Sequence, residues 1–200
     1  MIAYAIEVAR QSGLFSHIVV STEDDEVAGV AEKCGAEIPF RRPEELADDY
    51  TGTNDVVSHA ITACELLGYP SDWVCCIYPA VPFICSDDIK GALELLRSTP
   101  SANYSFPVTE FPSAIQRALR RNHSGLMESF YPEYETARTQ DLEQAFHDAG
   151  QFYWGQRESW MCNPSIHNNA VGFVIPNWRV ADIDTPQDWE RAERLFSARC

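Results

Sequence analysis

Hydrophobic positions in the first forty residues switch between the period of a helix and the short apolar runs of strands. Apolar residues recur at helical spacing from Ile2 to Gln11, and Gly13 stands where a helix commonly ends. The β-branched run 18–20 predicts a strand, and a Ser-Thr-Glu-Asp-Asp turn connects it to a helix containing Val27 and Val30. This order is typical of a βα unit, and segment 37–40 predicts another short strand.

The next part of the chain predicts a loop, a helix and a buried strand. Residues 41–53 are polar and rich in turn formers, whereas apolar residues from Asn54 to Leu67 recur on one helical face. The continuous apolar run Trp73–Tyr78 is typical of a strand buried on both sides, as in a parallel sheet.

The middle of the chain loses its regular period after one more helix and strand. A helix is expected over Ile89–Arg97, with Ser86 or Asp87 as its N-cap, and a strand over Asn103–Val108. From Glu110 to Gly155 aromatic and polar residues alternate with little period, which we interpret as an insertion facing the substrate.

The last part of the chain predicts two short strands, 168–175 and 179–183, and a final helix. Thr185-Pro186 would start this helix, with proline at the first helical position. The residues expected to pack inward from it are Trp189, Ala192 and Leu195. Alternating strands and helices indicate an α/β fold with a mostly parallel, mixed sheet flanked by helices, in a single domain over residues 1–200.

Composition narrows the functional classes. The 200 residues carry a formal charge of −15, so a basic nucleic-acid-binding face is not expected. No run reaches the roughly 18 apolar residues of a membrane helix, and the first residues lack a basic signal-peptide region. Seven cysteines without a CxxC pair fit free thiols in a reducing compartment. We therefore expect a soluble, cytoplasmic protein.

The segment VADIDTP carries the strongest local chemistry. If it is a strand, Asp182 and Asp184 point to one face while Ile183 points to the core. Two neighbouring carboxylates repel each other unless a cation lies near them, and Mg²⁺ takes one or two carboxylates together with substrate phosphates. The alternative is that Asp184 or Thr185 only caps the final helix.

Two further segments carry polar groups that fit either a binding site or a solvated surface. Segment 137–150 contains a guanidinium, amides, an imidazole and carboxylates, and it fits either a carboxylate-binding site or a solvated helix. His147-Asp148 suggests a dyad, but adjacent residues rarely face each other. The chain has no GxSxG elbow, GxGxxG loop or Walker loop. Arg41-Arg42-Pro43 fits a phosphate contact or a solvated turn equally well.

Taken together, five segments resemble the CMP-sugar synthetase family, the CTP-dependent cytidylyltransferases for nonulosonic acids. In chain order they are MIAYAIEVARQSGLF, VVSTEDDEVAGVAEKCGAEIPFRRPEELADDYTGT, YPAVPF, RTQDLEQAFHDAGQFYWG and VADIDTPQDW, which span residues 1 to about 190. The phrase HDAGQFYW is similar to the branch that activates pseudaminic acid rather than ordinary sialic acid.

The resemblance implies a fold of the nucleotide-diphospho-sugar transferase (Rossmann-like) type, a reaction and a set of site residues. CTP and a nine-carbon α-keto acid sugar would give CMP-sugar and pyrophosphate, by attack of the anomeric hydroxyl on the α-phosphorus. Catalysis would be positioning and charge neutralisation. Matched to the family, catalytic and Mg²⁺-binding roles fall to Asp182 and Asp184, nucleotide binding to Ser21, Arg42 and Thr53, and sugar binding to Tyr78, Arg138, Gln140 and His147.

The resemblance also implies a departure and a partner. Family members begin with a strand and a basic, glycine-containing loop around the triphosphate, and the printed sequence begins downstream of both. We therefore expect a truncated chain with weakened CTP binding and an exposed sheet edge. A homodimer is expected through an insertion at about residues 110–160. Two alternatives stay open: a synthetase for sialic or legionaminic acid, and an inactive binding module of the same fold.

Overall fold

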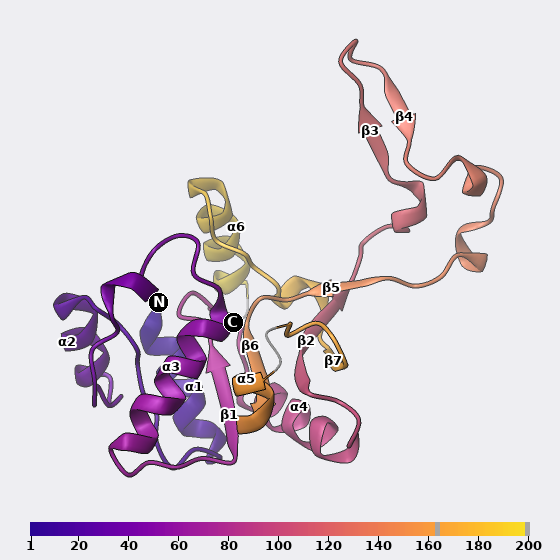
Figure 1. Ribbon diagram of the computed structural model, residues 1–200. Coiled ribbons are helices and arrows are strands. Elements are labelled where there is room, and N and C mark those ends of the chain that lie inside the picture. The colour runs from indigo at the N-terminus through magenta and orange to yellow at the C-terminus, as the bar shows by residue number, and fades with distance from the viewer. Residues whose placement is uncertain (163–164, 199–200) are drawn as a thin grey trace.

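The computed structural model describes residues 1–162 and 165–198, and a five-stranded sheet lies at the centre of their body (Figure 1). The strands follow the order β1-β6-β2-β5, and β7 also pairs with β2. They are β1 (Trp73–Ile77), β2 (Tyr104–Glu110), β5 (Phe146–Asp148), β6 (Phe152–Gln156) and β7 (Ala170–Val174). Sheet and helices together confirm the expected α/β fold.

The expectation of a mostly parallel sheet is wrong for the described strands. Only β2 and β7 pair in parallel, whereas β1–β6, β2–β6 and β2–β5 are antiparallel. The reason is the return of the chain through β5 and β6, which follow each other closely and both run against β2. Antiparallel neighbours need no crossover helix, so this return is short. Two strands of this sheet thus lie in the stretch that lacked a clear period.

Helices cover both faces of this sheet. One face is covered by α4, which contacts α1, β2, β6 and β7, and the other by α3 and α5, which contact each other. The helices are α1 (Ile2–Ser12), α2 (Asp25–Lys33), α3 (Thr53–Leu66), α4 (Ser86–Ser98), α5 (Arg157–Cys162) and α6 (Pro186–Ser197). The helices expected near residues 2, 27, 54, 89 and 186 are therefore confirmed.

Strand β6 supplies side chains to two hydrophobic cores. Phe152 and Trp154 pack with α4 residues such as Ile89, while Tyr153 packs with Tyr104 and Trp160 on the opposite face. The alternation follows from the two-residue period of a strand. Trp154 and Trp160 are among the most completely buried side chains, and their indole N–H groups donate to the carbonyls of Ile89 and Val74. Burial of these rings fixes β6 between the helical layers.

Two of three expected helix caps are present. Asp24 caps α2 by accepting the amide N–H of Val27 at 2.8 Å. Thr185 caps α6 in a reciprocal arrangement with Asp188, and Pro186 follows at the first helical position. The expectation for α4 is wrong, because Ser86 and Asp87 lie inside its first turn and the N-cap residue is Cys85, without a side-chain cap.

Three short segments differ from the sequence expectations. Segments 18–20 and 37–40 contribute one parallel bridge, between Val19 and Glu37, instead of two strands. Residues 179–183 are not a strand, because a 3₁₀ turn (Asn177–Arg179) ends there and none of the pairings among the described strands includes them. In α6, Ala192 is buried as expected, whereas Trp189 is half exposed.

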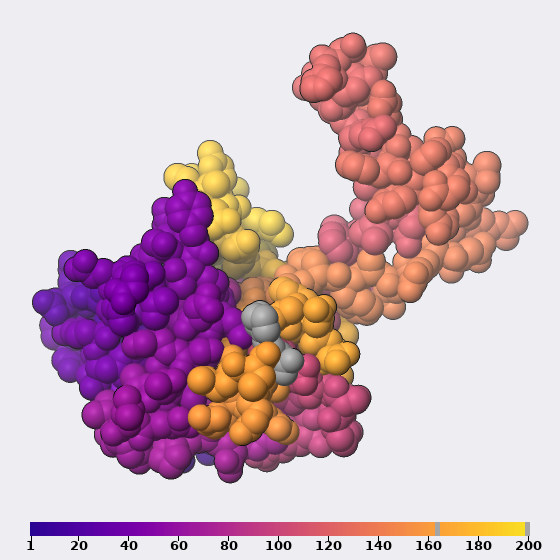
Figure 2. All heavy atoms as spheres, viewed as in Figure 1, coloured from indigo at the N-terminus to yellow at the C-terminus, as the bar shows by residue number. Residues whose placement is uncertain are grey.

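Residues 111–145 form an arm that leaves the body between β2 and β5 (Figures 1 and 2). Its tip is a hairpin of β3 (Leu119–Arg121) and β4 (Met127–Ser129), and Gly125 takes positive φ in the turn. Three 3₁₀ turns lie along the arm: Ile115–Arg117, Pro132–Tyr134 and Thr139–Asp141. The apolar side chains that the arm exposes include Phe111, Ile115, Leu119, Leu126, Met127, Phe130, Tyr131 and Tyr134.

The cysteines are structural rather than reactive where they lie in the sheet. Burial raises the pKa of the Cys75 and Cys76 thiols, that of Cys76 to about 12. The six described cysteines are unpaired, and Cys200 lies outside the described residues.

None of the described helices has the length and apolar character needed to cross a membrane.

Gly155 in β6 tests the tight packing between the sheet and α5. A Cβ at this position would lie 2.7 Å from Nε1 of Trp160 and 2.9 Å from the ring of Tyr104, both buried. We expect Gly155→Ala to lower the free energy of unfolding by roughly 1–3 kcal/mol, measured by urea denaturation. The control is Gly29→Ala in α2, where nothing lies within 4 Å and a gain of about 0.5–1 kcal/mol is expected. Equal shifts in both variants would contradict the packing argument.

Candidate active site

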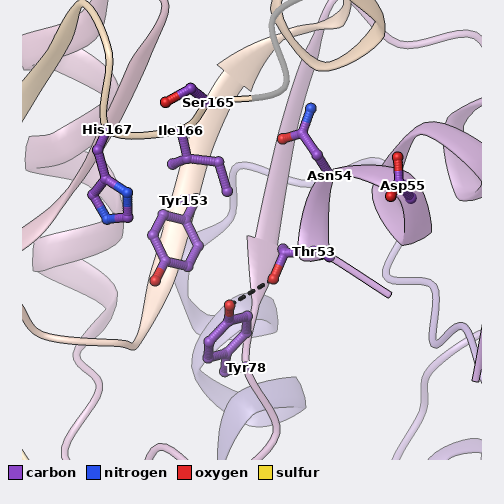
Figure 3. A pocket seen from close by; sticks show the side chains of 9 residues that line it. Thr53, Asn54, Asp55, Tyr78, Tyr153, Ser165, Ile166 and His167 are labelled. Atoms are coloured by element: carbon purple, nitrogen blue, oxygen red, sulfur yellow. Dashed lines mark hydrogen bonds between the residues drawn. The ribbon is translucent and has the colours of Figure 1, made fainter. Parts of the chain in front are cut away.

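A cavity of about 520 Å³ lies where α3 begins, where β1 ends and beside the loop that follows α5. Figure 3 shows Thr53, Asn54 and Asp55 on α3 at one side and His167 at the other, with Tyr78 and Tyr153 between. The lining residues are Gly52, Thr53, Asn54, Asp55, Tyr78, Tyr153, Ser165, Ile166 and His167. Two residues singled out from the sequence, Thr53 and Tyr78, thus share one cavity.

Thr53 and Tyr78 are joined directly. The Thr53 hydroxyl and the Tyr78 hydroxyl lie 2.7 Å apart and form a hydrogen bond (Figure 3). Thr53 is the first residue of α3, after Gly52 in an extended conformation. Tyr78 follows β1, and its amide N–H donates to the carbonyl of Gln151 at 2.9 Å. A helix start and a strand end therefore fix the two hydroxyl groups against each other.

Asp148 bonds to two residues of the cavity wall. Its Oδ2 accepts the Tyr153 hydroxyl at 2.9 Å and Nε2 of His167 at 2.8 Å, while its Oδ1 accepts the Gly150 amide at 2.8 Å. Burial, followed by the negative charge of Asp148, raises the pKa of Tyr153 well above its usual range. The Tyr153 hydroxyl therefore keeps its proton and donates.

His147 lies outside the cavity lining. Its Nδ1 donates to the backbone carbonyl of Asp148 at 2.9 Å, and its ring packs 4.9 Å from Phe111 at the base of the arm. Adjacent residues of a strand point to opposite sides, so the imidazole and the Asp148 carboxylate face apart. The sequence analysis argued against a His147-Asp148 dyad, and the structure agrees. The contact of Asp148 with His167 was not predicted from the sequence.

Ser21 and Arg42 lie on neighbouring segments of the body and not in the cavity lining. The Arg42 guanidinium bonds to Glu23, with Nε 3.0 Å from Oε2, and this bond lowers the pKa of Glu23. The Arg42 amide donates to the Thr22 carbonyl at 3.1 Å. The Ser21 hydroxyl is buried and has no hydrogen-bond partner among the described residues. A polar ligand reaching this place would satisfy it.

Arg138 and Gln140 lie on the arm. Arg138 is the N-cap of the 3₁₀ turn that contains Gln140, and both side chains are exposed. Neither lines the cavity, because the arm projects from the body (Figure 2). Within one chain the predicted sugar residues are therefore divided between cavity and arm.

Asp182 and Asp184 are exposed on the irregular segment before α6. The segment is not one of the described strands, yet its burial alternates, with Asp182 and Asp184 exposed and Ile183 partly buried. The structure fixes its start: Arg179 binds Asp88 through two hydrogen bonds of 2.7 and 3.0 Å, and its carbonyl accepts the Gln151 side chain at 2.7 Å. Among the described residues, no three His, Cys, Asp or Glu side chains gather to hold a metal.

The chain is similar to several proteins of known description. The sequence model of the family described as cytidylyltransferase matches residues 1–150. A pseudaminic acid cytidylyltransferase of Campylobacter jejuni is 39% identical over 197 residues, 98% of this chain and 84% of that protein. A CMP-N,N'-diacetyllegionaminic acid synthase of Legionella pneumophila is 25% identical over 98% of this chain and 84% of that protein.

A solved structure of CMP:2-keto-3-deoxy-manno-octonic acid synthetase complexed with CTP superimposes with a TM-score of 0.70. The match covers 100% of this chain and 88% of the other at 16% sequence identity. This likeness confirms the nucleotidyltransferase type of fold expected from the sequence.

The Asp88–Arg179 pair yields a stability prediction. Burial lowers the pKa of Arg179, but the hydrogen bonds and charge of Asp88 outweigh it and raise that pKa, so the guanidinium stays charged. Arg179→Met would leave the Asp88 carboxylate buried and unpaired, and we expect a loss of roughly 3–5 kcal/mol in urea unfolding. The double variant Asp88→Leu/Arg179→Met should recover much of the lost free energy of unfolding.

The matched control is Arg41→Met, which breaks an exposed pair with Asp25 and should cost less than about 1 kcal/mol. A cost for Arg179→Met as small as that of Arg41→Met would show that the buried pair does not anchor the segment.

Proposed function

The chain belongs to the cytidylyltransferase family, and we propose that it transfers CMP from CTP to pseudaminic acid, with release of pyrophosphate. The observation that carries this proposal is the 39% identity, over 98% of the chain, to a pseudaminic acid cytidylyltransferase. The anomeric hydroxyl oxygen would form a bond to the α-phosphorus of CTP while the bond from that phosphorus to the β-phosphate oxygen breaks. The hydroxyl proton leaves, and pyrophosphate departs.

The cavity supports an assignment of two subsites. Thr53, proposed to contact the nucleotide, is hydrogen-bonded to Tyr78, proposed to contact the sugar, so the two subsites would meet at this bond. Ser21 and Arg42 are proposed to extend the nucleotide side, where the buried Ser21 hydroxyl lacks a partner among the described residues. For a nucleotide phosphate to bind Arg42, it would compete with Glu23 for the guanidinium.

Asp182 and Asp184 are proposed as the Mg²⁺-binding pair. Their donor set suits this ion, because Mg²⁺ keeps several waters and takes one or two carboxylates plus substrate phosphates. Bound there, the ion would neutralise charge on the triphosphate. The protein's own contribution is to hold the two carboxylates on a segment anchored by Arg179 and by the cap of α6.

Arg138, Gln140 and His147 are proposed to complete the sugar site from the arm and its base. Arg138 suits the sugar carboxylate, since a guanidinium binds a carboxylate through two parallel hydrogen bonds. Because the arm projects from the body, we propose a homodimer in which the arm reaches the partner (Figure 2). We also propose that this homodimer is cytoplasmic.

Turnover tests the function and the aspartate pair together. With CTP and Mg²⁺, we expect faster pyrophosphate release with pseudaminic acid than with sialic or legionaminic acid. Asp182→Asn and Asp184→Asn should each lower kcat by at least a hundredfold without a change in the unfolding midpoint. Asp87→Asn, an exposed carboxylate of α4, is the matched control. Faster pyrophosphate release with another sugar would favour one of the alternative synthetases. The absence of release with every sugar would favour the inactive binding module.

The arm tests the homodimer. Light scattering at micromolar concentration should give the mass of two chains, because the exposed apolar side chains of the arm need a partner. Leu119→Glu and Phe130→Glu should shift the mass toward one chain, whereas Leu66→Glu, at an exposed position where α3 ends, should not. A one-chain mass for the unmodified protein would contradict this proposal.

A further inference from the structure

We infer that Asp148 positions His167 in the cavity so that the histidine binds the sugar acid through a hydrogen bond to its second ring nitrogen. This inference rests on the proposed function, because it names a further specificity residue of the same site. His167 lies in the turn formed by residues 166–169 before β7 and lines the cavity opposite α3 (Figure 3).

The Asp148 carboxylate is held firmly enough to act as a support. Asp148 ends β5 and pairs with Val108 of β2. Its Oδ1 accepts the amide of Gly150, a residue at φ +63° that turns the chain between β5 and β6. Its Oδ2 accepts a hydrogen bond from the Tyr153 hydroxyl, and burial raises the pKa of that hydroxyl, which favours the protonated, donating form. Both carboxylate oxygens are thus engaged before His167 is considered.

The bond to Asp148 determines which ring nitrogen of His167 is left for a ligand. A carboxylate only accepts, so Nε2, 2.8 Å from Oδ2, carries a hydrogen. In the neutral imidazole Nδ1 is then an acceptor, and no described residue bonds to it. The ring lies edge-on to Phe106 at 5.1 Å, which limits its rotation, and 64% of the side chain is exposed.

A purely structural role does not account for this exposure. A histidine that only tied the loop to β5 would gain from burial, whereas this one presents an unpaired acceptor at the edge of a cavity. The group it suits is a hydrogen-bond donor, such as the acylamino N–H or a hydroxyl of an N-acylated sugar acid. His167 lies beside Tyr153, on the side of the cavity away from Thr53, so we assign it to the sugar rather than to CTP.

Two substitutions separate the ligand role from the structural one. In His167→Gln the amide can reach Asp148 from the position of Nε2 but leaves no acceptor at the position of Nδ1. In His167→Asn an acceptor stays near the position of Nδ1, but the bond to Asp148 is lost. A structural role predicts that the glutamine variant behaves like the unmodified protein.

We expect His167→Gln to raise KM for pseudaminic acid roughly five- to tenfold, with KM for CTP and the urea midpoint unchanged. His167→Asn should retain part of the sugar affinity. Asp148→Asn should raise the same KM, and the double variant with His167→Gln should cost less than the sum of the two. The matched control is His17→Gln, which alters another histidine–carboxylate pair, with Glu37, outside the cavity lining.

Calorimetric titration with pseudaminic acid decides the question independently of turnover. Weaker sugar binding in His167→Gln than in the unmodified protein would support the inference even if no pyrophosphate were released. The lack of pyrophosphate release would count against the proposed activity alone. Equal sugar binding in the two proteins, no sugar binding by either, or an equal loss of CTP affinity would overturn it.

Discussion

Strand β6 has to fill two cores at once, because it lies between β1 and β2 with helices on both faces. Phe152 and Trp154 enter the core under α4, and Tyr153 enters the core under α3 and α5. A shift of β6 by one residue would exchange these faces, placing the Trp154 indole away from the Ile89 carbonyl and removing Tyr153 from the cavity. The register of this one strand therefore sets both the packing of the body and the wall of the site.

Paired carboxylates connect this framework to the segments for which chemical roles are proposed. The chain carries a formal charge of −15, so unpaired acids repel one another over much of its surface. Asp88 and Asp148 are among the paired acids, and each is bound by side chains from other parts of the fold. Asp88 holds the segment that leads to Asp182, and Asp148 holds the loop that carries His167. The site is thus arranged by acids that do not themselves line the cavity.

Sequence patterns predicted the helices and strands that leave a signal in their own stretch of the chain. The helices were predicted because their apolar residues recur at helical spacing, and β1 because its apolar run is continuous. Strand β6 was missed because Phe152–Gln156 mixes large aromatic residues with glycine and is buried on both faces, so it shows no alternation. Segment 179–183 does alternate, yet it is not a strand, since pairing depends on a neighbour that the sequence does not reveal. The contact between Asp148 and His167, 19 residues apart, depends on tertiary packing alone.

The arm and the cavity share a mechanical element. The arm returns to the body through β5, a strand of three residues whose last member is Asp148, and β5 is attached to β2 over only three paired positions. Force applied to the arm by a bound neighbour would act on this short ladder and be transmitted to the Asp148 carboxylate. The arm and the cavity are therefore connected through β5, and a change in the angle of the arm would alter the hydrogen bonds of Asp148 with His167 and Tyr153.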